Sequence, residues 1–142
     1  MKKSLSIALV LLMLCGCGAT KSERVCTLNN NEAHNTIRIY YDAKGQISEY
    51  KLVSKQTIDE STVKAIGSSK IESYIEKTYA SLETAGVKVD TDFNHDNNEV
   101  TMTMLVNVDD LSKKDYKKYY LPDNKKLNTM INTIEKVGFK CK

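Results

Sequence analysis

The stretch 87-VKVDTDFNHDNNEVTMTMLVNV-108 contains two runs in which apolar and polar residues alternate, with residues typical of a turn between them. In the first run Val87, Val89 and Phe93 share one face. Apolar residues of the second run occupy every second position, at Val100, Met102, Met104, Val106 and Val108. Alternation is typical of half-buried strands, and the polar residues 96–98 predict the turn. The stretch therefore predicts an antiparallel hairpin with one face in a core.

A second hairpin is predicted upstream of this stretch. Ile37, Ile39 and Tyr41 alternate with polar residues, and 42-DAKG-45 is typical of a hairpin turn because Gly45 suits a positive φ. The strands predicted in this half of the chain are residues 25–28, 36–42 and 46–55.

Helices are predicted between the two hairpins. The tetrads 57-TIDE-60 and 69-SKIE-72 match the capping box, and Gly67 lies between them. We expect a short helix, a break, and a longer helix over residues 70–85 that Gly86 ends. The apolar stripe of the longer helix is Ile71, Tyr74, Ile75, Thr78, Leu82 and Ala85.

Two more helical segments are predicted after residue 108. Asp109 is placed to cap a short basic helix that runs through Lys118, and Pro122 suits the first turn of the last helix. Gly138 is placed to end that helix, and residues 139–141 can form a final strand segment. The buried stripe of the last helix is Leu127, Met130, Ile131, Ile134 and Val137.

This order of elements, βββ-α-ββ-α, predicts an α+β fold. We expect an antiparallel sheet of about five strands, with the helices packed on one face. The sequence shows no repeat and no second domain, so residues 24–142 are predicted to form a single domain.

The N-terminal residues have the pattern of an export signal. Lys2 and Lys3 precede the apolar run 5–14, which is too short to span a bilayer as a helix. The order 14-LCGC-17 resembles the bacterial lipobox, which implies cleavage before Cys17 and lipidation of Cys17. The alternatives are a buried helix of a cytosolic domain and a secreted protein without lipid. The predicted division is a signal peptide at 1–16, the lipidated cysteine with a short tether at 17–23, and the domain at 24–142.

The four cysteines separate into two groups. The expected cleavage before Cys17 removes Cys15 with the signal peptide, and Cys17 is the expected site of lipidation. Cys26 and Cys141 are then the two unmodified cysteines. An exported domain meets oxidising conditions, in which a remaining pair most simply forms a disulfide. Two free thiols are an alternative, as is a metal or redox role, which no CxxC motif supports.

The segment 90–101 has part of the spacing of a calcium loop. The oxygen ligands of such a loop would be Asp90, Asp92, Asn94 and Asp96. His95 stands where the loop needs glycine, and Thr101 where it needs a bidentate glutamate. The alternative is the solvent-facing side of a strand followed by a turn.

Other candidate residues are few. His34 and His95 are the only histidines, and each has polar neighbours in the sequence. No nucleophile elbow or phosphate-binding glycine loop is present in the sequence.

A cluster of lysines interspersed with tyrosines has two interpretations. It is a patch that faces the membrane or a partner protein, or it is a solvated surface whose tyrosines point into the core. The lysines of this cluster are Lys113, Lys114, Lys117, Lys118, Lys125 and Lys126, and the first four are the predicted patch.

Several of these segments carry a family resemblance. The lipobox, the hairpin 37-IRIYYDAKGQISEY-50, the helix that ends in 85-AGV-87 and the last helix that ends in 136-KVGFK-140 resemble the YehR-like bacterial lipoproteins. The resemblance covers roughly residues 24–142. It implies a small α+β lipoprotein domain and transfers no functional residue, because the family is itself uncharacterised.

Charge and composition narrow the classes of function. Without its signal peptide the chain has 19 basic and 18 acidic side chains, and Arg24 and Arg38 are its only arginines. This balance of charges argues against a nucleic-acid partner.

The functional expectations follow from the lack of any catalytic or cofactor motif. We expect no cofactor and no catalysis. The leading hypothesis is a non-enzymatic lipoprotein on the outer side of the cell membrane, held there by its N-terminal lipid, that binds another envelope component. The alternatives are a small-ligand or cation carrier and an envelope hydrolase with an unrecognised site.

Overall fold

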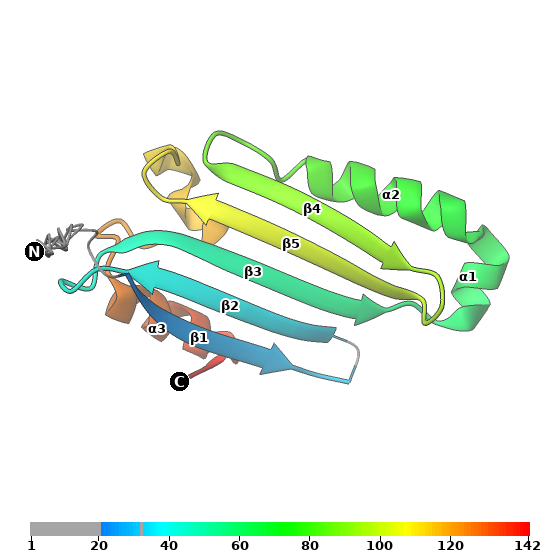
Figure 1. The fold of residues 1–142 in the computed structure, drawn as a ribbon, viewed down its shortest axis with the longest axis horizontal. Helices are drawn as coiled ribbons and strands as arrows, with labels where there is room; N and C mark the ends of the chain where they lie inside the picture. The colour runs from blue at the N-terminus through cyan, green and yellow to red at the C-terminus, as the bar shows by residue number, and fades with distance from the viewer. Residues whose placement is uncertain (1–20, 32) are drawn as a thin grey trace, which may run out of the picture.

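The computed structural model describes residues 21–31 and 33–142. In these residues, six strands form one antiparallel sheet, and four helical segments accompany it (Figure 1). The strands are β1 (Ser22–Asn29), β2 (Ala33–Tyr41), β3 (Ile47–Thr57), β4 (Val87–Asn94), β5 (Glu99–Asn107) and β6 (Lys140–Cys141). The helices are α1 (Glu60–Ile66), α2 (Ser68–Ala80), the 3-10 helix η1 (Lys113–Tyr119) and α3 (Leu127–Lys136). The α+β prediction is confirmed, and the sheet has six strands because the C-terminal segment pairs as well.

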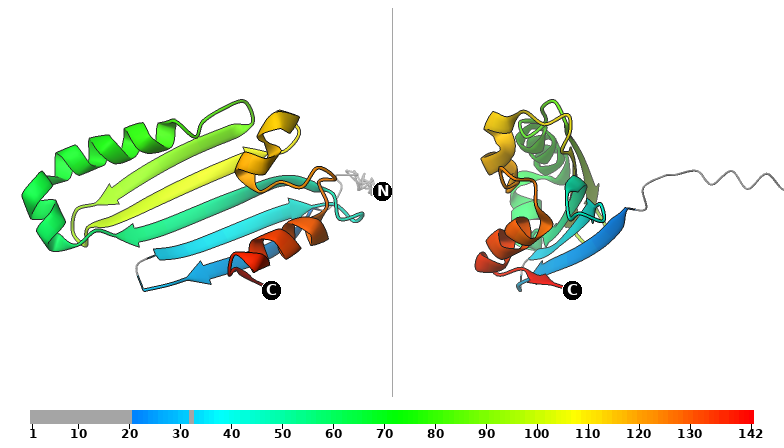
Figure 2. Two further views of the ribbon diagram at one scale, coloured as in Figure 1. Left: turned by 180° about the vertical axis from the view of Figure 1, so that it is seen from behind. Right: turned by 90° about the vertical axis from the view of Figure 1, so that its left-hand side faces the viewer.

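The strand order across the sheet is β4-β5-β3-β2-β1-β6, and each pair of neighbours is antiparallel. Both predicted hairpins form, and Gly45 has the expected positive φ of 71° in the turn between β2 and β3. The helices lie on one face of the sheet, as the right-hand view of Figure 2 shows. We call this side the helix face and the other side the open face.

The alternation of the strands decides which side chains reach the helix face. Ile39, Tyr50 and Val106 are almost fully buried there, in a large cluster that also contains Met130 and Ile134 of α3. A smaller cluster joins α2 to the far ends of β4 and β5. It consists of Ile71, Ile75, Phe93 and Val100.

Helix α2 ends at Ala80, five residues before the predicted end at Ala85. The residues that follow form a local turn and a contact with a distant tyrosine in place of further helical turns. The carbonyl of Leu82 accepts a hydrogen bond from the hydroxyl of Tyr119, and Thr84 pairs with Val87 in an isolated bridge. Only two of the predicted stripe positions are buried, Ile71 and Ile75, whereas Tyr74 is 72% exposed.

The predicted helix caps are also wrong. Asp59 caps α1 by accepting from the backbone N–H of Thr62 at 2.8 Å, while Thr57 belongs to β3. Hydrogen bonds from the hydroxyl groups of Ser61 and Thr62, together with this backbone N–H, lower the pKa of Asp59 to about 2. Gly67 is the N-cap of α2 and makes no side-chain hydrogen bond. The capping-box pattern therefore placed the N-cap two residues too early for α1 and two residues too late for α2.

Helix α3 begins at Leu127, not at the predicted Pro122. The intervening segment is tied to the β2–β3 turn: the N–H of Ile47 donates to the carbonyl of Lys125, and the N–H of Leu127 donates to the carbonyl of Gly45. Lys125 has a positive φ of 51°, which excludes a helix there. At the other end of α3, Val137 is 53% exposed although it was predicted to be buried.

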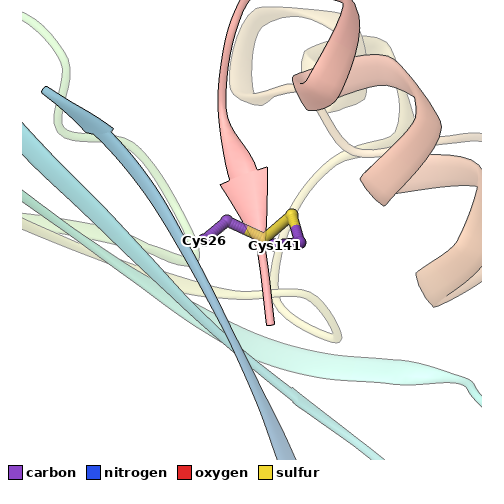
Figure 3. Close-up of a disulfide and its surroundings, with 2 residues drawn as sticks. All are labelled: Cys26 and Cys141. Carbon is purple, nitrogen blue, oxygen red and sulfur yellow. A yellow bond between two sulfur atoms is a disulfide. The ribbon is translucent and has the colours of Figure 1, made fainter.

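A disulfide joins Cys26 to Cys141 (Figure 3). The two residues lie directly opposite each other in the pair formed by β1 and β6, and Cys26 is completely buried. Cys15, Cys17 and the predicted signal peptide lie outside the described residues. Within residues 21–31 and 33–142, no helix is long and apolar enough to cross a bilayer.

Candidate functional site: a groove beside α3

The two longer helices cover different parts of the helix face. Figure 2 shows α2 along one side of the sheet and α3 across one end of the other side. A groove of about 420 Å³ opens between α3 and the region where η1 meets the turn after α2. Its lining is mostly aliphatic and aromatic. We call it the α3 groove, and its residues are Leu28, Asn35, Ile37, Tyr50, Leu52, Leu82, Met102, Met104, Lys118, Tyr119, Tyr120, Ile134, Val137 and Phe139.

The floor of the α3 groove is a row of residues across three neighbouring strands. Ile37 of β2 lies opposite Leu52 of β3, which lies opposite Met104 of β5. Met102 follows on the same face of β5, two residues along the strand. Methionine side chains adapt to irregular apolar surfaces, so this floor suits a partner of variable shape.

Two tyrosines build one wall of the groove and use their hydroxyl groups internally. The hydroxyl of Tyr50 donates to the carbonyl of Tyr119, and the hydroxyl of Tyr119 donates to the carbonyl of Leu82 at 2.6 Å. Burial raises the pKa of Tyr50 above its ordinary value, so its hydroxyl stays protonated and remains a donor. Because these hydroxyl groups are already paired, the wall offers no free hydroxyl group to a ligand.

The rim of the groove exposes large apolar side chains. Tyr120 is 55% exposed and Val137 is 53% exposed. Tyr120 has a left-handed backbone with a φ of 57° because it ends η1, where its N–H donates to the carbonyl of Lys117. Apolar side chains at the mouth of an apolar groove are typical of a binding site.

Lys118 is the only charged residue among the described residues that line the α3 groove. Its ammonium group lies 5.1 Å from the centre of the Tyr119 ring, which is within the range of a cation–π interaction. Lys118 takes part in none of the ion pairs found in the described part of the chain. Its positive charge is therefore available at the groove.

The other hollows are less suitable as binding sites. A groove of about 590 Å³ beside α2 is lined by Ile66 and Tyr74 of the helices, and Lys70 is its only charged residue among those described. Its floor has one buried strand residue, Val100, and the polar Gln56. A hollow of about 710 Å³ wraps around the edge of β4 and includes residues from both faces of the sheet, so it is a surface depression.

The four oxygen ligands predicted for a cation lie along β4 and its turn. Asp90, Asp92 and Asn94 are exposed at alternate positions of the open face, where an extended strand holds them apart. Asp96 lies in the turn, and its N–H donates to the side chain of Asn94. No group of three His, Cys, Asp or Glu residues within residues 21–31 and 33–142 is arranged to hold a metal ion. A calcium loop therefore has no geometric support.

The two histidines lie in separate exposed places. His34 is the second residue of β2 and is exposed. His95 lies in the β4–β5 turn, with its Nε2 atom 3.7 Å from Glu72 Oε2 and its ring in a T-shaped arrangement with the ring of Phe93. Neither histidine lines the α3 groove. The structure therefore adds no catalytic constellation to the hydrolase hypothesis.

The predicted basic patch coincides with η1. Lys113, Lys114, Lys117 and Lys118 are all exposed, but only Lys118 reaches the groove. Among the interspersed tyrosines, Tyr116 and Tyr119 are buried, as one of the two interpretations expected, and Tyr120 is exposed.

The sequence did not predict the α3 groove, because the residues of its floor alternate in the same way as core residues. The one local signal was the amphipathic mixture of lysine and tyrosine around Lys118.

These features define a small α+β domain with one antiparallel sheet, helices on one face and an apolar groove beside the last helix. No protein-family model and no curated protein matches the chain. Its fold is similar to the NMR structure of Escherichia coli YehR, with a TM-score of 0.66 and 13% identity over 87% of this chain and 92% of that chain. It is also similar to the NMR structure of a protein from Streptococcus pneumoniae TIGR4, with a TM-score of 0.62 and 15% identity over 100% of this chain and 96% of that chain. The expected YehR-like fold is confirmed.

Proposed function

We propose that this protein is a lipid-anchored binding protein of the cell envelope, without catalytic activity, that holds an apolar ligand in the α3 groove. The observation that carries the proposal is a groove with an apolar floor of Ile37, Leu52 and Met104 and with the exposed side chains Tyr120 and Val137 at its rim. The volume of the groove, about 420 Å³, lies in the range of about 300–1,000 Å³ that is typical of small-molecule sites.

A neutral apolar dye tests whether the groove binds at all. We expect N-phenyl-1-naphthylamine to fluoresce when it is mixed with the chain from residue 18 to residue 142, which contains every described residue. The double variant Tyr120→Ser/Val137→Ser should weaken dye binding about tenfold, because both substitutions remove exposed apolar surface without opening the core.

The matched control is Tyr40→Ser, which removes a tyrosine from the open face of β2. Dye binding should be unchanged in this variant. Equal losses in the rim variant and in the control, or no fluorescence with the unsubstituted chain, would contradict the proposed site.

The membrane anchor is proposed on the lipobox-like order 14-LCGC-17. We expect the chain expressed in bacteria to partition into the detergent phase of a Triton X-114 extract, because several acyl chains give stable attachment. Cys17→Ala should move it to the aqueous phase. Cys15→Ala, the neighbouring cysteine in the same stretch, should leave partitioning unchanged, and the opposite result for the two variants would place the lipid on Cys15.

A further inference from the structure

We infer that the ligand of the α3 groove is a fatty acid, whose acyl chain lies over Leu52 and Met104 and whose carboxylate meets Lys118. This inference rests on the proposed function and names the class of ligand. Three observations support it: the charge at the groove, the backbone hydrogen bonds already made by the strands beneath it, and the size of the groove.

The charge at the groove is a single cation. Among the described residues that line it, Lys118 is charged, Asn35 is polar, and no acidic residue is present. The hollows at the edge of β4 differ in this respect, since Glu83 and Asp90 line both of them and Lys88 lines only the larger one. Charge therefore favours binding of a carboxylate at the α3 groove over the edge of β4. The groove beside α2 also has one cation, Lys70, and differs from the α3 groove in its floor, which has a single buried strand residue.

The number of donors favours a carboxylate over a phosphate head. Phosphate groups are typically held by arginine forks or by several donors together. The α3 groove offers one lysine and no arginine. One ammonium group matches the single charge of a carboxylate.

The backbone beneath the groove cannot pair with an extended peptide. The floor belongs to β2, β3 and β5, and each of these strands has a neighbouring strand on both sides. The N–H and C=O groups of an extended peptide would thus lose water without gaining main-chain partners, which is costly. An acyl chain brings no such groups.

The size of the groove suits a ligand with a single acyl chain. Its volume of about 420 Å³ lies in the lower part of the range of about 300–1,000 Å³ that is typical of small-molecule sites.

Displacement of N-phenyl-1-naphthylamine by dodecanoate and by 1-dodecanol tests the inference. The two probes share the same chain length and differ in the charge of the head group. With the unsubstituted chain, dodecanoate should displace the dye at about threefold lower concentration than 1-dodecanol. Lys118→Glu should abolish this preference and leave displacement by 1-dodecanol unchanged.

The matched control is Lys117→Glu, which makes the same change of net charge one residue away, on a side chain that does not line the groove. It should keep the preference for dodecanoate. Equal losses in the two lysine variants would show a general charge effect and overturn the role of Lys118. Thermal unfolding of both variants confirms that they are folded.

The remaining outcomes separate the inference from the proposed function. Dye binding without a preference for dodecanoate would overturn the fatty-acid assignment and leave an apolar binding site. Stronger displacement by dodecyl phosphate than by dodecanoate would overturn the carboxylate assignment. Displacement by an amphipathic helical peptide alone would indicate a protein partner at the rim. Absence of dye binding would contradict the proposed function, because the α3 groove would then not be a binding site.

Discussion

Replacement of both Cys26 and Cys141 with alanine is expected to lower the free energy of unfolding by up to about 5 kcal/mol. The disulfide closes a loop with a sequence separation of 115 residues, and the chain-entropy model assigns about 5 kcal/mol to a loop of this length as an upper value. A small domain is stable by only about 5–15 kcal/mol, so this change removes a large share. Urea denaturation of both proteins measures the difference.

Reductant supplies the control for this prediction. Dithiothreitol should lower the stability of the unsubstituted protein toward that of the double variant, and it should leave the double variant unchanged. Equal urea midpoints for the oxidised protein and the double variant would contradict a stabilising disulfide. Mass analysis after alkylation should find two free thiols, those of Cys26 and Cys141, only after reduction.

Gly86→Ala is expected to destabilise the domain by about 2–5 kcal/mol. Gly86 has a φ of 82°, and a Cβ atom there would lie 2.7 Å from the backbone nitrogen of Leu111 and 2.8 Å from the carbonyl oxygen of Asn107. The positive φ costs about 1–2 kcal/mol for an L-residue. The overlap with backbone atoms adds about 1–3 kcal/mol, because backbone cannot move aside as a side chain can. Thermal or urea unfolding measures the total.

Gly45→Ala is the matched control for this substitution. Gly45 has a similar φ of 71°, but no atom lies within 4 Å of its added Cβ position. We expect a loss of about 1–2 kcal/mol from the backbone conformation alone. The difference between the two variants therefore reports the contact of Gly86 with β5 and the segment before η1. Equal losses would show that this contact is unimportant.

The fold was largely predictable because alternation is a local property of the sequence. Ile37, Ile39, Val100 and Val106 lie on the helix face as their spacing indicated. The helix ends were not predictable, because distant residues decide them. Leu82 continues the helical spacing, yet its carbonyl is paired with Tyr119 across the fold.

The groove was not predictable for a related reason. Spacing shows which side chains face a core, but not which of them a helix leaves open. Met102 and Met104 were predicted as buried strand residues, and they are also groove floor because α2 and α3 lie apart on the helix face. Val137 was assigned to the buried stripe of α3, whereas its position near the helix end leaves it at the rim.

The disulfide also determines how the domain responds to mechanical tension. A pull between the two ends of the chain passes from Cys26 directly to Cys141 through the covalent bond and bypasses everything between them. Every residue that lines the α3 groove, from Leu28 to Phe139, lies inside this closed loop. Tension between the ends can peel the first residues of β1 from the sheet, but the binding surface lies outside the path of the load.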